Sequence, residues 1–214
     1  MGLVSSNSWP HLNKLSYTVE GMTSSNVETE IKLRIDSVAG AKRLLERLGF
    51  SIVKRRVLEI NTIFDTADGV LRSGRKLLRL REAGQRHTLA FKGPPRSSRF
   101  KSREEFESEY SDPASRWRIL EGLGYAPVFR YEKYRTEFGR QGEPGVVTLD
   151  ETPIGNYLEV EGAPRWIDRT ARVLGYSTGD YITASYGRLY LEWCRKAGHT
   201  PGNMVFDARH RGKI

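Results

Sequence analysis

Hydrophobic and polar residues alternate through much of this chain, and the stretch VETEIKLRI, residues 27–35, shows the pattern most clearly. Such alternation predicts a β-strand with one apolar face and one charged face. On the charged face Glu28 and Glu30 lie about 7 Å apart along the strand, and Lys32 follows. Two adjacent carboxylates on one face are compatible with a metal site, although a solvated strand face is the simpler interpretation.

At least seven segments share this design, and their charges sort by sign. The charged pairs at i, i+2 are acidic at Glu28/Glu30, Glu105/Glu107 and Glu159/Glu161, and basic at Arg79/Arg81 and Lys133/Arg135. Shorter alternating stretches cover residues 61–65, 87–93 and 146–151, the last of which places Asp150 on the polar face. The segments together predict an antiparallel sheet with one charged face.

Four other segments have the spacing of helices. Ser37 is a candidate N-cap for a helix that runs to Leu48 and ends at Gly49. We expect further helices at residues 115–124, 165–174 and 183–197. Within these helices the sequence predicts inward positions for Trp117, Leu120, Leu123, Tyr186 and Trp193. Asp65 is interpreted as a turn residue before Gly69 rather than as a metal ligand.

Two arrangements of the strands remain open. If the strands close into a barrel, either the charged faces point to solvent around an apolar interior, or helices cover the apolar faces and the charges line the inside. Buried charges carry a large desolvation cost unless partners or a ligand pair them. The second arrangement therefore implies a wet tunnel, in which carboxylates suit Mg²⁺ or Mn²⁺ and Arg and Lys suit phosphate oxygens.

Composition restricts the class of protein. The chain has 214 residues, enough for one good core, and a net charge of +9 with a pI near 9.7. This balance suits a polyanionic partner. A single cysteine, Cys194, excludes a disulfide framework within the chain and a thiolate metal site. No apolar run reaches the length of a membrane span, and we expect a cytoplasmic protein.

The ordered motifs resemble those of a known family. VETEIKLRI resembles the E-x-E-x-K signature of the CYTH superfamily, the triphosphate tunnel metalloenzymes. The resemblance covers roughly residues 26–197 and continues in order through TIFDTADGVLRSGRKLLRLR, LAFKGP, SREEFE, EKYR, TLDETPIGNYLEVEG and SYGRLYL. It implies an α+β fold in which a closed antiparallel β-barrel forms a tunnel with a charged interior, flanked by helices.

The resemblance also implies roles for individual residues. Metal-binding acids would be Glu28, Glu30, Glu105, Glu107, Asp150, Glu159 and Glu161. The triphosphate would be held by Lys32, Arg79, Arg81, Lys92, Arg103, Lys133 and Arg135. The catalytic set would comprise Glu28, Glu30, Lys32, Asp150, Glu159 and Glu161, with Mg²⁺ or Mn²⁺ as cofactor.

The motifs FDTADGVLRSG, EKYR and SYGRLYL look most like class IV adenylate cyclases, which implies conversion of ATP to cyclic AMP and pyrophosphate. The alternatives are a thiamine or inorganic triphosphatase and a non-catalytic polyphosphate- or nucleic-acid-binding module. Some triphosphatases of the family have a lysine on the C-terminal helix, where Arg188 is the nearest basic residue here. The implied partner is a nucleoside triphosphate or another triphosphate, and a homodimer is compatible with the sequence.

The two ends of the chain lack periodicity. We expect a flexible leader over residues 1–26, with Met22 as an alternative start, one CYTH domain over residues 27–198, and a basic, frayed tail over residues 199–214.

Overall fold

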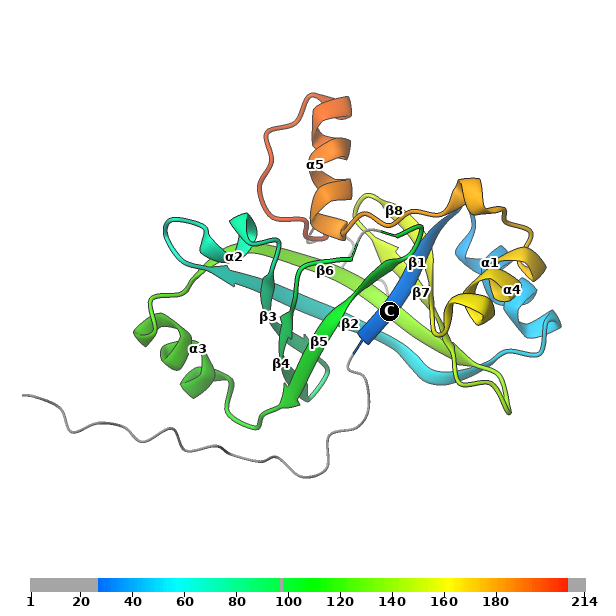
Figure 1. Ribbon diagram of the computed structural model, residues 1–214, viewed down its shortest axis with the longest axis horizontal. Helices are drawn as coiled ribbons and strands as arrows, with labels where there is room; N and C mark the ends of the chain where they lie inside the picture. The colour runs from blue at the N-terminus through cyan, green and yellow to red at the C-terminus, as the bar shows by residue number, and fades with distance from the viewer. Residues whose placement is uncertain (1–26, 97, 208–214) are drawn as a thin grey trace, which may run out of the picture.

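The computed structural model describes residues 27–96 and 98–207, and within them the strands close into one antiparallel barrel (Figure 1). Around the barrel the strands follow the order β1–β5–β4–β3–β2–β6–β7–β8, and β8 pairs with β1 to close it. The strands are β1 (Val27–Ile35), β2 (Ser51–Asp65), β3 (Leu77–Ala83), β4 (Arg86–Lys92), β5 (Lys101–Glu109), β6 (Ala126–Gly139), β7 (Val146–Thr152) and β8 (Gly155–Glu161). The expected leader over residues 1–26, with Met22, lies outside the described residues.

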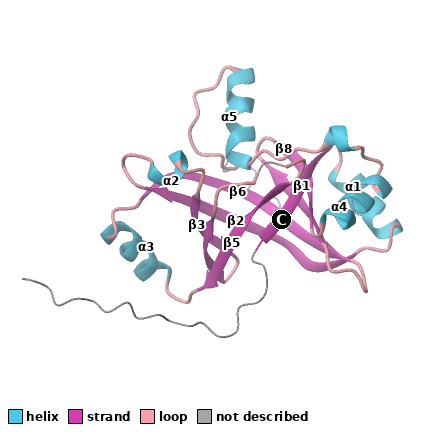
Figure 2. Ribbon diagram, viewed as in Figure 1, coloured by secondary structure: helices cyan, strands magenta, loops and turns pink. Residues whose placement is uncertain are grey.

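The helices lie outside the barrel (Figure 2). They are α1 (Val38–Arg47), α2 (Val70–Ser73), α3 (Pro113–Gly122), α4 (Pro164–Val173) and α5 (Tyr186–Ala197), with a short 3₁₀ helix at Thr178–Asp180. Ser37 caps α1 as predicted, because its side-chain oxygen accepts a hydrogen bond from the Gly40 N–H at 3.1 Å. No helix in the described part of the chain is long and apolar enough to cross a membrane.

The apolar faces of the strands point outward and are covered by helices. Ile31 and Leu33 of β1 are fully buried in a cluster with Leu45 of α1 and Ile167 of α4. Figure 1 shows α1 and α4 side by side against β1 and β7. Full burial of each such side chain contributes about 1.5–3 kcal/mol. This outer core is what permits the opposite strand faces to be polar.

The charged faces point into the barrel. Lys32, Lys133 and Asp150 are almost completely buried, with exposures of 1%, 2% and 0%. Buried charges on β1, β6 and β7 therefore meet one another inside the barrel instead of facing solvent. The closed barrel with a charged interior is confirmed, and the alternative with solvated charged faces is wrong.

Several expected elements differ in detail. The strand expected at residues 61–65 is the end of the longer β2, and α5 begins at Tyr186 after the N-cap Ser185 rather than at residue 183. Leu123 and Trp193 were expected to point inward, but they are 66% and 39% exposed. Both lie near helix ends. There the helical spacing identifies the apolar face of the helix, but it does not show whether another element packs on that face.

The segment from residue 199 to Asp207 was expected to belong to a frayed tail, but it packs against the barrel. Strand β7 pairs with β6 only from Tyr134 onward, which leaves the edge of β6 at residues 130–132 free of β7. Met204, which is 1% exposed, fills this edge: its N–H donates to the Arg130 carbonyl and its carbonyl accepts from the Glu132 N–H. Backbone pairing and burial therefore hold this segment against the barrel.

Candidate active site

A cavity of about 1550 Å³ occupies the inside of the barrel and extends to α2 and α5. Of the residues that the sequence singled out, those that line the cavity are Glu28, Glu30, Lys32, Arg79, Arg81, Lys92, Arg103, Lys133, Arg135 and Glu159. Each projects from the polar face of its strand, so the alternation in sequence brings them together. Asp150 and Glu105 stand behind lining cations, at 2.6 Å from Arg135 and from Lys92 respectively.

Acidic residues from β1 and β8 meet through strand pairing. The register places Glu30 opposite Glu161 and Lys32 opposite Glu159. The Lys32 ammonium lies 3.0 Å from Glu30 and 3.0 Å from Glu159, so it joins the two strands across the wall. Burial alone would lower the pKa of Lys32, but Glu159 and Glu30 outweigh it and raise the pKa above its usual value. Lys32 is therefore firmly cationic.

A second group of charges joins β1, β4 and β5. The Lys92 ammonium lies 2.7 Å from Glu28 and 2.6 Å from Glu105, and Lys101 forms an ion pair with Glu30. Burial raises the pKa of Glu28, and the charge of Glu30 adds to the effect. In contrast, burial of Glu30 is outweighed by Lys101 and Lys32, and its pKa lies well below the usual value.

A third group forms around Asp150 of β7. Arg135 donates from Nε to Oδ1 at 2.7 Å and from Nη2 to Oδ2 at 2.6 Å, a bidentate pair, and it also contacts Glu159. Lys133 lies 2.9 Å from Asp150, and the Tyr186 hydroxyl donates to the same carboxylate at 2.7 Å. The first residue of α5 is thereby tied to the charges inside the barrel.

Other cations have hydrogen-bonding capacity to spare. Among the described residues, the buried Nε groups of Arg79 and Arg103 have no hydrogen-bond partner. The nearest carboxylates are at the margin of bonding, since Arg79 lies 3.5 Å from Glu105 and Arg103 lies 3.8 Å from Glu28. Because buried donors are normally satisfied, these two guanidinium groups are equipped to bind an anion that enters the cavity.

Carboxylate oxygens are suitable ligands for Mg²⁺ or Mn²⁺, and crowding among them favours a cation. Solvent reaches Glu161, yet desolvation by surrounding protein and the charges of Glu28 and Glu30 raise its pKa to about 7. Within residues 27–96 and 98–207, however, no three Asp, Glu, His or Cys side chains are arranged to hold a metal ion, since ammonium groups such as Lys92 lie between them. The donor chemistry fits a divalent cation, and binding requires these ion pairs to rearrange.

Two predicted acids lie at the margin of the site. Glu107 has a side chain that is 35% exposed and lies 3.6 Å from Arg79, and Glu161 is exposed to solvent. Neither lines the cavity, unlike Glu28 and Glu30. The sequence assigned both residues to the correct face of their strands. How deep they lie in the barrel depends on how far each strand extends past its neighbours.

Sequence reasoning missed three residues of the interior. Glu59 is buried and pairs with Lys133, and the half-buried Lys101 pairs with Glu30. Both could have been found by continuing the alternation of β2 and β5 towards their first residues. Tyr186 was expected in an apolar core, and it gave no other signal, because an aromatic residue in the first turn of a helix is usually a packing residue.

Comparisons with known proteins agree with this architecture. The family model described as the CYTH domain matches residues 26–186. A Methanocaldococcus jannaschii protein named "putative adenylate cyclase" is 28% identical over 148 residues, which cover 69% of this chain and 83% of that protein.

Solved structures show the same fold. A "putative adenylate cyclase" from Vibrio parahaemolyticus is 21% identical with a TM-score of 0.68, over 78% of this chain and 98% of that one. A putative adenylyl cyclase from Hippeastrum, described as having a dominant triphosphatase activity, is 24% identical with a TM-score of 0.58, over 81% and 97% of the two chains.

Proposed function

Because this chain belongs to the CYTH domain family, we propose that it is a divalent-metal-dependent enzyme that converts ATP to cyclic AMP and pyrophosphate inside the barrel. Relatives in this family have adenylate cyclase names or a described triphosphatase activity, which supports an enzyme acting on triphosphates. The observation that carries the proposal is the set of buried cations around one cavity, with unpartnered donors on Arg79 and Arg103.

The cations account for binding of the triphosphate. Arg79 and Arg103 have donors free for phosphate oxygens, and Lys92 and Lys133 bring further charge to the cavity. A triphosphate also competes for the cations that now pair with Glu28 and Glu105, so its binding releases carboxylates. Hydrogen bonds between charged groups contribute about 1.5–3 kcal/mol each, enough to offset part of the cost of separating these ion pairs.

The released acids complete the site. Glu28, Glu30, Glu159 and Glu161 come from the paired strands β1 and β8, and they are the residues that would hold Mg²⁺ or Mn²⁺. A bound divalent cation neutralises phosphate charge and lowers the pKa of the attacking hydroxyl.

The proposed reaction is a displacement at the α-phosphorus of ATP. The ribose 3′-hydroxyl loses its proton to solvent water, its oxygen bonds to the α-phosphorus, the bond from that phosphorus to its bridging oxygen breaks, and pyrophosphate leaves. Positive groups such as Arg79 and Lys92 stabilise the charge that develops on the leaving group.

Triphosphate hydrolysis is a second candidate, supported by the activity described for the Hippeastrum structural neighbour. The same cations would hold the substrate, and water would attack the terminal phosphorus. The two reactions differ in which phosphorus is attacked, so the products distinguish them.

The test is to incubate the protein with ATP and Mg²⁺ or Mn²⁺ and to separate the products. Cyclic AMP with pyrophosphate is expected, ADP with phosphate assigns the second candidate, and no product with either metal contradicts both. Glu28→Gln should abolish turnover, because it removes a negatively charged metal ligand from β1. Glu104→Gln on the exposed face of β5 is the matched control and should leave turnover unchanged.

A further inference from the structure

The cavity has more room than a triphosphate alone requires. Its volume of about 1550 Å³ exceeds the roughly 300–1,000 Å³ of common ligand pockets. Beyond the charged interior it continues between the turn that joins α2 to β3 and the helix α5. We call this part the outer chamber, and its lining includes Arg75, Phe129, Leu189, Tyr190 and Trp193.

Arg75 has an unusual backbone conformation. Its φ is 55°, and among the described residues it is the only non-glycine residue with a positive φ. It follows α2, where its N–H donates to the Arg72 carbonyl at 3.0 Å and the Lys76 N–H donates to the Leu71 carbonyl at 2.8 Å. Helices that end in this left-handed conformation usually have glycine there, because a Cβ atom is penalised. The arginine side chain therefore occupies a position where glycine is structurally preferable.

The Arg75 side chain has no evident structural role that offsets this strain. It is exposed, and within residues 27–96 and 98–207 no hydrogen bond, ion pair or ring contact engages its guanidinium group. It lines the outer chamber. Strained residues concentrate at functional sites, where the position of the side chain matters more than backbone energy.

The α5 side of the chamber differs chemically from the charged interior. Phe129 and Tyr190 stack with ring centroids 5.9 Å apart, and Tyr190 and Trp193 stack at 6.2 Å. Leu189 of α5 packs against the same cluster. Aromatic and apolar side chains suit a planar base and a sugar, and a guanidinium group can stack on a base or donate to its acceptors.

We propose that Arg75 contacts the nucleoside part of a nucleoside triphosphate, which lies in the outer chamber while the phosphates lie among the buried cations. The inference rests on the proposed function for the placement of the phosphates. It adds a residue that selects nucleotides over inorganic triphosphate and places the nucleoside at the α2–α5 end of the cavity.

The test is to measure binding of ATP and tripolyphosphate to the full chain without metal by calorimetry, and thermal unfolding without ligand. Arg75→Gly should raise the Kd for ATP about tenfold, as expected for loss of one charged contact, and change the Kd for tripolyphosphate less than about twofold. It should also raise Tm, by about 2–4 °C, because glycine relieves the backbone strain. Weaker nucleotide binding by a more stable protein is the expected signature.

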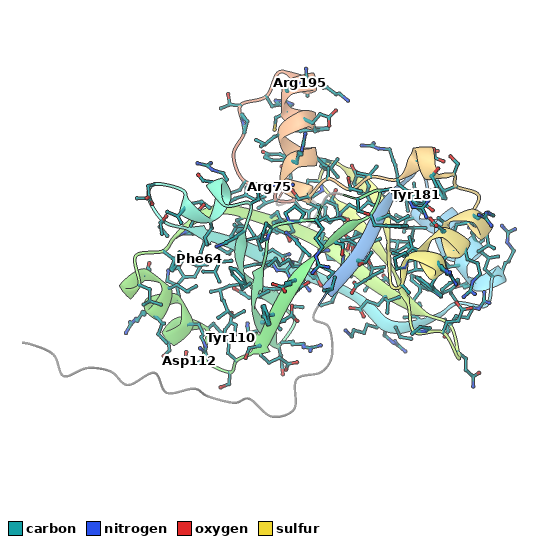
Figure 3. All side chains as sticks on the ribbon, viewed as in Figure 1. Phe64, Arg75, Tyr110, Asp112, Tyr181 and Arg195 are labelled. Atoms are coloured by element: carbon teal, nitrogen blue, oxygen red, sulfur yellow. The ribbon has the colours of Figure 1, made fainter. Side chains whose placement is uncertain are left out.

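Arg195→Ala is the matched control, since Arg195 is an exposed arginine near the end of α5 that does not line the cavity (Figure 3). It should leave both Kd values unchanged. An equal loss of both ligands in Arg75→Gly would place Arg75 among the phosphate-binding residues, and an unchanged Kd for ATP would remove it from the site; either overturns the inference. Binding of both ligands without turnover in metal contradicts the proposed function alone.

Discussion

At the residue scale, Arg135 of β6 joins charges of β7 and β8 inside the barrel. Its guanidinium group makes a bidentate pair with Asp150 and also contacts Glu159, and all three side chains are almost completely buried. Its pKa is raised well above the usual value, because the charges of Asp150 and Glu159 outweigh the effect of burial. Removal of one partner from such a cluster leaves buried charge uncompensated.

Arg135→Ala should therefore lower the free energy of unfolding by about 3–5 kcal/mol and lower kcat/KM by about one to two orders of magnitude. Arg135→Lys should recover part of each loss, since it restores charge without the planar fork. Denaturant unfolding and steady-state kinetics measure the two effects. Arg140→Ala, at a partly exposed position paired with Glu143, is the control and should cost at most about 1 kcal/mol. If the two alanine variants behave alike in kinetics, Arg135 does not contribute to the site.

Glu161 provides a test by pH. Its pKa is about 7 in the folded protein against 4.5 for an ordinary glutamate, so between these values the folded state holds a proton that the unfolded state has lost. Stability without metal should accordingly fall as pH rises from about 4.5 to about 7.

Glu161→Gln removes this titration, so its Tm should exceed that of the wild type by a margin that grows from pH 5 to pH 8 in chelator-treated protein. The measurement is thermal unfolding across that range. A margin that is constant with pH would mean that neither desolvation nor the charges of Glu28 and Glu30 raise the pKa of Glu161. Added Mg²⁺ or Mn²⁺ should reduce this margin above pH 7, since the wild type has one more of the four proposed carboxylate ligands than the variant.

At the scale of elements, α5 is held by its two ends. Before the helix, Ile182 exchanges backbone hydrogen bonds with Lys32 of β1 at 2.8 and 2.9 Å. After it, Met204 pairs with the free edge of β6, and the Tyr190 hydroxyl contacts the Asn203 carbonyl at 3.2 Å. Figure 1 shows α5 standing away from the barrel, so these attachments define where one wall of the cavity lies.

Met204→Ala should lower the free energy of unfolding by about 2–5 kcal/mol and speed amide exchange in α5 and at residues 130–132 of β6. Hydrogen exchange with mass spectrometry locates the effect. Leu191→Ala on α5, where Leu191 is 55% exposed, is the control for loss of apolar volume and should change exchange little. Faster exchange confined to the segment after α5 would mean that this segment does not support the helix.

At the scale of the molecule, the barrel has apolar clusters on its outside and paired charges on its inside. Apolar clusters outside the strands stabilise the fold, whereas the interior carries the cost of buried charges. The ligand that we propose for this interior is a polyanion for the free arginine donors together with a divalent cation for the crowded carboxylates. A protein whose positive charge lay on its outer surface, without a charged cavity, would instead favour nucleic acid as its ligand.

Tripolyphosphate with Mg²⁺ should therefore stabilise the protein by about 2.7 kcal/mol at a hundredfold excess over Kd, measured by thermal unfolding at several ligand concentrations. Duplex or single-stranded nucleic acid should bind weakly and lose affinity steeply as salt rises, since only surface charge is available to it. Salt-resistant nucleic-acid binding without protection by tripolyphosphate would reverse the ranking of these ligands.

The sequence by itself determined which residues share a strand face. Because side chains alternate with a period of two, Glu28, Glu30 and Lys32 had to lie on the face opposite Ile31 and Leu33 whatever the fold. Local rules also determined the Ser37 cap, and the Asp65 turn, where the carboxylate accepts from the Thr66, Leu71 and Arg72 N–H groups. The ordered motifs then predicted the barrel and its charged interior.

Only the tertiary structure decided which charges meet and how deep they lie. Pairing of Arg135 with Asp150 depends on the register of neighbouring strands, and pairing of Lys32 with Glu159 joins strands from opposite ends of the barrel sequence. The position of Tyr186 depends on the contacts at both ends of α5, which no local pattern encodes. The physical reason is that alternation and capping act between near neighbours, whereas ion-pair choice and burial depend on which strands the closed barrel brings together.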